Sequence, residues 1–264
     1  MLEIISEDEC NDTYGSMRMW AALVLKKELS EEENFPEIPH ERTVYRIMER
    51  EGLIHTPKKK PNGITKEDKE AQKSDNLLKQ DFVAENPYEK CVTDITEIPC
   101  ADDKNLYVSA IFDCFNNEAL GLTMADNMRA ELVVDTLAQA VKMHPMLSYN
   151  NAIIHSDRGS QYTSVMYKNF IEKYKIIQSM NSAAGRCHDN AKCESLWTRF
   201  KEELLYGRYD TKKMHIDDVK TLVWRYFMSY WNNRRICSAI GGIPPALKKQ
   251  RYYKNLNPSR LFAA

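Results

Sequence analysis

The sequence predicts an α/β fold, in which a mixed five-stranded sheet is flanked by helices and preceded by a small N-terminal helical region. Two patterns support this prediction. Short β-branched segments alternate with amphipathic helical segments in the middle of the chain, whereas the first 55 residues carry apolar residues at helical spacing. The 264 residues are 43% hydrophobic and 28% charged, which is typical of a globular protein.

We expect the chain to be organised in four parts. Residues 1–55 form a helical, helix-turn-helix-like region. Residues 56–85 form a polar linker, because their first two-thirds contain prolines and a glycine and lack apolar periodicity. Residues 86–248 form the sheet-containing core together with C-terminal helices, and residues 249–264 form a basic tail.

Strands are expected in the core where β-branched residues lie between turn residues. Three consecutive strands are predicted in CVTDITEIP, LYVSAIFDCF and EALGLTMAD, and their short connections favour antiparallel neighbours. Two more are predicted in NAIIHSD and IIQSM. Amphipathic helices are predicted in RAELVVDTLAQAVKMH, in TSVMYKNFIEKY and from about Ala191 onward. This order of elements indicates a mixed sheet.

Three acidic residues occupy positions where a carboxylate is costly or conspicuous. Asp94 lies in the middle of the first apolar strand, and Asp157 ends the fourth strand. Glu194 lies in the first turn of the helix AKCESLWTRFKEELLY, near the edge of its apolar face. If the first and fourth strands are neighbours, Asp94 and Asp157 face each other at one end of the sheet.

Such an arrangement points to metal ions. Two carboxylates a few ångströms apart repel each other unless one is protonated or a cation lies between them. Carboxylate oxygens select Mg²⁺ or Mn²⁺, and three carboxylates suit a two-ion site for phosphoryl transfer. The alternative is that the three acids are unrelated surface residues, and their spacing alone leaves this alternative open.

The segments around these acids resemble a known family. CVTDITEIP, HSDRGSQYTS and AKCESLWTRFKEEL, in that order, resemble the catalytic core of OrfB-type DDE transposases of bacterial insertion sequences, which is similar to the retroviral integrase core. The similarity continues through SMNSAAGRCHDNAKCES and YFMSYWNNRRICSAIGGIPPALKK. YGSMRMW and RTVYRIMEREGL resemble the helical segment that precedes the family's core. The resemblance therefore covers nearly the whole chain.

This resemblance implies a ribonuclease-H-like fold with a metal-binding, catalytic triad of Asp94, Asp157 and Glu194. It also implies a polynucleotidyl transferase with an endonuclease step, which cleaves and joins DNA ends with two Mg²⁺ or Mn²⁺ ions. Lys201 matches a lysine seven residues after the family's glutamate. On a continuous helix it lies two turns along the same face, where it either holds a phosphate or is an ordinary exposed lysine.

The resemblance further implies partners for the chain. These are double-stranded DNA, as the element's terminal repeats and as target, further copies of the chain on that DNA, and a segment encoded by the family's first reading frame. That segment is not among these 264 residues, and the resemblance implies that it is joined by frameshifting.

The chain departs from the family pattern at two places. Between Asp157 and Glu194 lie 36 residues, one more than is usual in the family. The extra residue is expected in the loop NSAAGR, where it leaves the glutamate in place. Cys91 stands where the family commonly has tryptophan, which alters core packing but not the chemistry.

A stripe of arginines is a candidate DNA contact in the N-terminal region. Arg42, Arg46 and Arg50 recur every four residues along one face of the helix HERTVYRIMEREGLI. They either contact phosphates or pair with neighbouring glutamates. The formal net charge of −1 conceals an asymmetry, since residues 195–264 hold 14 Lys or Arg but only 5 Asp or Glu. An anionic partner is therefore expected at the C-terminal part as well.

Four more residues are candidate DNA contacts. Ser160 and Gln161 follow the second aspartate of the triad and are expected to contact the DNA backbone or to orient metal ligands. Arg234 and Arg235 follow an aromatic-rich helical segment that is expected to be core, and they are expected to contact phosphates. His155 is expected to be a hydrogen-bonded structural residue rather than a ligand.

Two alternatives to this function remain open. A nuclease of the same fold would hydrolyse DNA without joining ends. A non-catalytic, transposase-derived DNA-binding protein would compete with an active transposase, although the intact acidic triad argues against it. A zinc site at Cys187, His188 and Cys193 is disfavoured, because the spacing lacks a fourth ligand.

The composition also indicates the environment of the protein. Seven cysteines without a CxxC pair argue against a disulfide framework. The acidic N-terminus MLEIISEDEC does not resemble a signal peptide, and no apolar run is long enough to cross a bilayer. We therefore expect a cytoplasmic bacterial protein without a membrane partner, which joins the nucleoid when it is bound to DNA.

Overall fold

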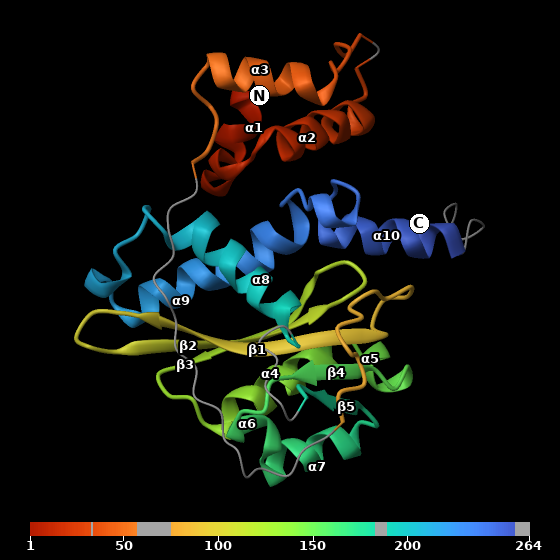
Figure 1. The fold of residues 1–264 in the computed structure, drawn as a ribbon, viewed down its shortest axis with the longest axis vertical. Coiled ribbons are helices and arrows are strands. Elements are labelled where there is room, and N and C mark those ends of the chain that lie inside the picture. The colour runs from red at the N-terminus through yellow and green to blue at the C-terminus, as the bar shows by residue number, and fades with distance from the viewer. Residues whose placement is uncertain (33, 57–74, 183–188, 257–264) are drawn as a thin grey trace. The chain divides into compact units, whose positions relative to one another are not determined.

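The computed structural model describes residues 1–32, 34–56, 75–182 and 189–256. The backbone divides into two compact units (Figure 1). The helical unit comprises Met1–Lys59 and Met228–Ala264, and the sheet unit comprises Lys60–Phe227. Much of the predicted linker and the end of the predicted basic tail lie outside the described residues.

The helical unit begins with short helical segments, which two longer helices follow. These elements are α1 (Leu2–Glu7), η1 (Glu9–Thr13), α2 (Ser16–Leu29) and α3 (Glu41–Arg50). Its C-terminal part adds η5 (Ser238–Ile240) and α10 (Pro245–Leu256). Val44 and Met48 are buried on one face of α3, as their spacing predicts, and belong to one apolar core with Tyr14, Met19 and Ile236.

Buried hydrogen bonds join the C-terminal residues to the N-terminal helices in this unit. Tyr230 Oη donates to Asn11 Oδ1 at 3.0 Å, and the backbone N–H of Ile236 donates to Tyr14 Oη at 2.9 Å. All four residues are buried. The compact units therefore divide the chain differently from the predicted core that ends at residue 248, because these bonds hold the chain from residue 228 onward in the helical unit.

The sheet unit contains one five-stranded sheet, which confirms the predicted mixed sheet. Its strands are β1 (Lys90–Pro99), β2 (Asn105–Asp113), β3 (Ala119–Ala125), β4 (Ile153–Ser156) and β5 (Ile177–Met180). In the order β3-β2-β1-β4-β5, the β1–β2 and β2–β3 pairs are antiparallel, and the β1–β4 and β4–β5 pairs are parallel. β1 is thus the central strand, with β4 as its parallel neighbour.

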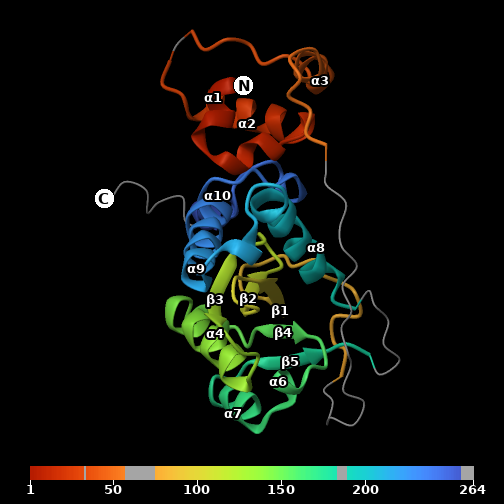
Figure 2. The same cartoon turned by 90° about the vertical axis from the view of Figure 1, so that its left-hand side faces the viewer.

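Helices cover both faces of this sheet, with α4 and α7 on one face and α8 and α9 on the other (Figures 1 and 2). The helices are α4 (Ala130–Met143), α5 (Met146–Tyr149), α6 (Ser160–Thr163), α7 (Val165–Lys173), α8 (Ala191–Phe200), η3 (Thr211–Lys213) and α9 (Ile216–Trp224). Leu132, Val133, Leu137 and Val141 of α4 are buried, as their periodicity predicts.

Aromatic side chains pack beneath α8. The ring centroids of Phe112 and Trp197 lie 5.5 Å apart, and those of Phe200 and Phe227 lie 5.0 Å apart. The helix that contains Trp197 is shorter than predicted, since α8 ends at Phe200 and continues as a π-helical turn, η2 (Lys201–Leu205). A second π-helical segment, η4 (Arg225–Trp231), follows α9. Its aromatic residues are buried, but the preceding Trp224 is 44% exposed, so its predicted core position was wrong.

Gly121 of β3 lies where α4 leaves no space for a side chain. A methyl group there would lie 2.6 Å from the carbonyl oxygen of Thr136 and 3.0 Å from Cβ of Ala140. We expect Gly121→Ala to destabilise the protein by about 1–3 kcal/mol, seen as a lower melting temperature. Gly15→Ala is the control, since nothing lies within 4 Å of its added Cβ. Equal losses in both variants would contradict this account of the packing.

Candidate active site

Asp94 lies on the central strand of the sheet. Its backbone pairs with Ala110 of β2, to which the hydroxyl of the preceding Thr93 also donates at 2.9 Å. Asn190, which precedes α8, donates its side-chain amide to the carbonyl oxygen of Thr93 at 3.3 Å. The start of α8 is therefore tied to β1 one residue away from the Asp94 carboxylate.

Asp157 follows β4 directly and lies beside Asp94. β1 and β4 pair in parallel with Val92 opposite His155, so the same register carried two residues further sets Asp157 opposite Asp94. The backbone N–H of Gly159 donates to Asp157 Oδ1 at 2.9 Å. This turn holds the carboxylate at the end of the strand.

Glu194 comes to the same region from α8, in the first turn of the helix, and is exposed. Its neighbours anchor the helix: Cys193 is fully buried, and Lys192 Nζ donates to the carbonyl oxygen of Cys114 at 3.1 Å. The Glu194 carboxylate lies close enough to Asp94 to raise the pKa of that residue. Asp157 and Glu194, both far from Asp94 in the sequence, thus lie within electrostatic range of it.

Burial and mutual repulsion favour the protonated form of Asp94. Burial is the largest cause and the negative charge of Asp157 the next, and together with Glu194 they raise the pKa of Asp94 to about 8. The N–H groups of Ile95 and Trp197 act in the opposite direction. Burial also raises the pKa of Asp157. The pair therefore holds a proton more readily than ordinary aspartates do.

The donor set fits a hard divalent cation in its chemistry. Carboxylate oxygens are the ligands that Mg²⁺ and Mn²⁺ prefer, and a cation would relieve the repulsion between the aspartates. Among the described residues, Trp197 Nε1 and Asn190 Oδ1 are buried without a well-formed hydrogen bond, and Asn190 is the N-cap of α8 while Trp197 lies within that helix. Within the described parts of the chain, no three His, Cys, Asp or Glu side chains are already gathered to hold a metal ion.

Lys201 begins the π-helical turn instead of continuing α8. Its half-buried ammonium donates to the carbonyl oxygen of Glu97 on β1 at 3.2 Å. Burial lowers the pKa of Lys201, while the negative charge of Asp94 opposes this change. The predicted phosphate contact stays a prediction, and the structure adds that this cation lies within electrostatic range of the acids.

Ser160 and Gln161 form the start of α6, just after Asp157. Ser160 is exposed, whereas Gln161 Nε2 donates to the carbonyl oxygen of Met128 at 2.9 Å, in the exposed connection between β3 and α4. Gln161 therefore links two segments beside the acids. The DNA contacts of both residues stay predictions.

His155 is hydrogen-bonded on both sides of its ring, as expected of a structural histidine. Nδ1 lies 2.8 Å from Ser179 Oγ, and Nε2 lies 2.9 Å from Asn181 Oδ1. Burial lowers the pKa of His155. The neutral ring thereby joins the ends of β4 and β5.

Asp189 is a residue whose role the sequence does not reveal. Its carboxylate accepts hydrogen bonds from the backbone N–H of Ser182 at 2.8 Å and from Gln80 Nε2 at 3.1 Å. Its place in the sequence, just before a helix, suggests only a helix cap. Asn190 occupies the N-cap position of α8, but neither residue makes a side-chain cap hydrogen bond.

The three arginines of α3 are all exposed in the helical unit. Arg50 Nε contacts Glu51 Oε1 at 2.8 Å, whereas Arg42 and Arg46 have no side-chain partner among the described residues. Arg42 and Arg46 therefore leave two uncompensated positive charges one turn apart on the helix.

Arg234 and Arg235 differ sharply in exposure. Arg235 is 2% exposed, and its guanidinium lies 4.4 Å from the ring centroid of Trp231. Its predicted phosphate contact is wrong for this structure, because a guanidinium buried on an aromatic ring offers no surface to DNA. Arg234 is exposed and contacts Asp8 at 3.0 Å.

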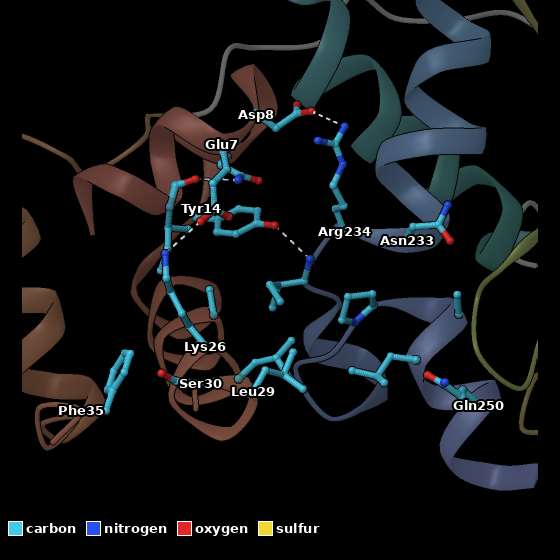
Figure 3. A pocket seen from close by; sticks show the side chains of 18 of the residues that line it. Glu7, Asp8, Tyr14, Lys26, Leu29, Ser30, Phe35, Asn233, Arg234 and Gln250 are labelled. Atoms are coloured by element: carbon cyan, nitrogen blue, oxygen red, sulfur yellow. Dashed lines mark hydrogen bonds and ion pairs between the residues drawn. The ribbon is translucent and has the colours of Figure 1, made fainter. Parts of the chain in front are cut away.

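A pocket of about 870 Å³ lies within the helical unit (Figure 3). Arg234 and Lys26 line it together with apolar residues of α2 and α10. Both cations are paired, Arg234 with Asp8 at 3.0 Å and Lys26 with Glu7 at 3.1 Å. Because every residue that lines the pocket belongs to the helical unit, it is separate from the three acids.

Two other expectations, on a zinc site and on membrane spans, can be compared only with the described part of the chain. Cys187 and His188 of the disfavoured zinc site lie outside the described residues, and Cys193 is one of six buried cysteines in the described ranges that form no disulfide. As for membranes, the described part of the chain contains no helix with the length and apolar character that a span requires.

Comparisons with known proteins point to integrase cores and transposases. Residues 84–187 and 175–245 match two models of the integrase core domain. An uncharacterized transposase-like protein of Haemophilus influenzae is 38% identical over 65% of this chain and 76% of its own. The transposase InsF for insertion sequence IS3A of Escherichia coli is 31% identical over 77% of this chain and 68% of its own. The HTLV-2 integrase catalytic core domain in complex with magnesium, a solved structure, is similar over 63% of this chain and 99% of its own, with 13% identity and a TM-score of 0.42.

The sheet order and the domain match define an integrase core of the ribonuclease-H-like class, as the resemblance predicted. The relatives narrow this class further. The chain belongs to the family of insertion-sequence transposases that carry such a core.

The raised pKa of Asp94 predicts that the metal-free protein loses stability as pH rises. The folded state binds the proton more tightly than the unfolded chain, so this stabilisation is complete below about pH 3.8 and disappears as pH increases to about 8. We expect Asp94→Asn to stabilise EDTA-treated protein at pH 9 by a few kcal/mol, at about 1.4 kcal/mol per pKa unit, and to change it little at pH 4. Melting temperatures at both pH values test this, with the exposed Asp126→Asn as control. An equal gain at both pH values would contradict it.

Proposed function

We propose that the protein is a DDE-type transposase that cleaves DNA at the ends of an insertion sequence and transfers the strands to target DNA. Family membership supports the proposal, and one observation within the chain carries it. Asp157 and Glu194 both lie near enough to Asp94 to raise its pKa, in a core of the integrase type. Acids that repel one another in a partly buried site are an arrangement that cation binding stabilises.

The reaction is proposed to depend on divalent metal. When bound, two Mg²⁺ or Mn²⁺ ions would activate the attacking oxygen and stabilise the leaving oxygen of a phosphodiester. Asp94, Asp157 and Glu194 would hold the ions. Because the pKa of Asp94 is about 8, this carboxyl is largely protonated near neutral pH, and a bound cation would displace that proton.

The chain's own side chains support an in-line displacement. Water first attacks a phosphodiester at the end of the element and releases a 3′ hydroxyl. This hydroxyl then attacks a phosphodiester of the target DNA and releases a 3′ hydroxyl of the target strand, so no covalent link between protein and DNA is required. Lys201 would hold a phosphate group from its position near Asp94. Gln161, which links two exposed segments beside Asp157, would steady the DNA backbone together with Ser160.

DNA binding away from the acids is proposed for the helical unit. Arg42 and Arg46 are the first candidates, since they are exposed and have no side-chain partner among the described residues. Arg50 and Arg234 each pair with a carboxylate already and rank below them. The family also leads us to propose that the chain acts as several copies on double-stranded DNA and is fused to a first-reading-frame segment.

Loss of an acid should abolish the chemistry and leave DNA binding intact. With duplex that carries the terminal repeats, we expect Asp157→Asn and Glu194→Gln to lower strand cleavage and joining by about 10³-fold or more, because a lost metal ligand removes several kcal/mol of transition-state stabilisation. Glu97→Gln is the control, as Glu97 is exposed on the same strand as Asp94. Denaturing gels separate cleaved from joined strands.

Three outcomes would overturn parts of this proposal. Undiminished cleavage by Asp157→Asn would remove this residue from the site. Cleavage without joined products would indicate a nuclease that only hydrolyses. No reaction from the wild type, alone or fused behind the first-frame segment, together with DNA binding, would indicate a non-catalytic DNA-binding protein.

Charge reversal on α3 should weaken DNA binding in a salt-dependent way. We expect Arg42→Glu combined with Arg46→Glu to make the negative slope of log affinity against log salt shallower by about 2, about one for each phosphate contact that is lost. Thr43→Glu is the matched control, because Thr43 is exposed on the same helix and the change adds a negative charge without removing an arginine. Fluorescence anisotropy over a salt series measures both. An unchanged slope would show that the stripe is only a solvated surface.

A further inference from the structure

The Asp189 carboxylate, just after residues 183–188, accepts hydrogen bonds from Ser182, just before them, and from Gln80, far away in the sequence. Oδ2 accepts from the backbone N–H of Ser182 at 2.8 Å, and Oδ1 accepts from Gln80 Nε2 at 3.1 Å. The residue is 2% exposed. Burial acts to raise the pKa of Asp189, but these N–H donors outweigh it and lower the pKa, so the carboxylate is ionised and accepts on both oxygens.

On the strand side, Ser182 follows a residue that is bonded to both neighbours of Asp157. The backbone N–H of Asn181 donates to the carbonyl oxygen of Ser156 at 3.1 Å. Arg158 Nε donates to the carbonyl oxygen of Asn181 at 2.5 Å. The position of Ser182 is therefore fixed relative to Asp157.

On the helix side, Asp189 directly precedes the residue that starts α8. Asn190 donates to the carbonyl oxygen of Thr93 at 3.3 Å, and Glu194 lies in the first turn of the helix. Hydrogen bonds and two peptide links, Asn181–Ser182 and Asp189–Asn190, thus lead from the neighbours of Asp157 to the start of the helix that bears Glu194.

We propose that Asp189 is a positioning residue that fixes where α8 begins relative to β4 and so sets the distance from Glu194 to the two aspartates. We call its bonds to Ser182 and Gln80 the Asp189 clamp. The clamp closes on residues outside 183–188, so the length of that segment does not decide where Glu194 lies. This accounts for a site that keeps its third acid in place with one residue more than is usual between Asp157 and Glu194. The catalytic consequence rests on the proposed function, whereas the structural one does not.

Asp189→Asn is the sharpest test of the clamp, because the amide has the same size but only one acceptor oxygen for two N–H donors. The matched control is Asp113→Asn. Asp113 is fully buried at the end of β2, and its two oxygens accept from the backbone N–H groups of Tyr88 and Phe115, both at 2.9 Å. Each variant thus leaves one N–H donor facing an amide in place of a carboxylate oxygen, so a difference between them reports position rather than general stability.

Amide hydrogen exchange tests the structural part without metal or DNA. Well below the melting temperature, we expect residues 190–196 to exchange at least tenfold faster in Asp189→Asn than in the wild type, while β1–β3 exchange as before. Asp113→Asn should speed exchange at the end of β2 and leave α8 unchanged. Wild-type exchange at the start of α8 in Asp189→Asn would overturn the proposal.

Mn²⁺ binding and strand cleavage test the functional part. In Asp189→Asn we expect the apparent affinity for Mn²⁺, from the electron paramagnetic resonance of free Mn²⁺, and the cleavage rate each to fall at least tenfold. Metal-free DNA binding should not change, and Asp113→Asn should keep both properties. Faster exchange with wild-type Mn²⁺ binding and cleavage would overturn the positioning role. Faster exchange in a protein whose wild type never cleaves DNA would overturn the proposed function and support the clamp.

Discussion

The repulsion between Asp94 and Asp157 is the constraint that determines the chemistry of the acidic site in the sheet unit. Parallel pairing of β1 with β4 sets the two carboxylates opposite each other, and their partial burial weakens the screening of their charges by water. The result is a carboxyl whose pKa is raised to about 8. In the proposed function a cation replaces this proton at the end of β4, and the remaining structure decides whether a third ligand is within reach.

The proposed third ligand, Glu194, lies on a helix whose placement depends on contacts far apart in sequence. Asn190 bonds to β1 beside Asp94, Lys192 bonds to the end of β2, and Trp197 packs on Phe112. These contacts hold the helix on the sheet, while the Asp189 clamp ties its start to the strand side. Glu194 itself is exposed and makes none of these bonds, so its position is set entirely by its neighbours.

Local pattern was enough to predict the strands, the mixed sheet and the inward face of α4, because each depends on periodicity within a short segment. The pairing of Asp94 with Asp157 needed only one further step, that β1 and β4 are neighbours. Contacts between distant segments were beyond such reasoning. Arg234 and Arg235 are adjacent and identical in type, yet only Arg235 is buried, because Trp231 lies beneath it. Asp189 likewise shows its role only when Gln80 and Ser182 are seen beside it.

An acidic site does not attract DNA by itself, since carboxylates repel phosphates. In the proposed function the positive charge that binds DNA therefore lies elsewhere, and the candidates are Arg42 and Arg46 in one unit and Lys201, within electrostatic range of Asp94, in the other. The same repulsion couples the two proposed ligands of the site, the cation and the DNA phosphate. A cation held by Asp94 and Asp157 removes their repulsion toward a phosphate, and a bound phosphate in turn favours the cation. In the proposed function, metal and DNA therefore strengthen each other's binding by the same factor, as thermodynamic reciprocity requires.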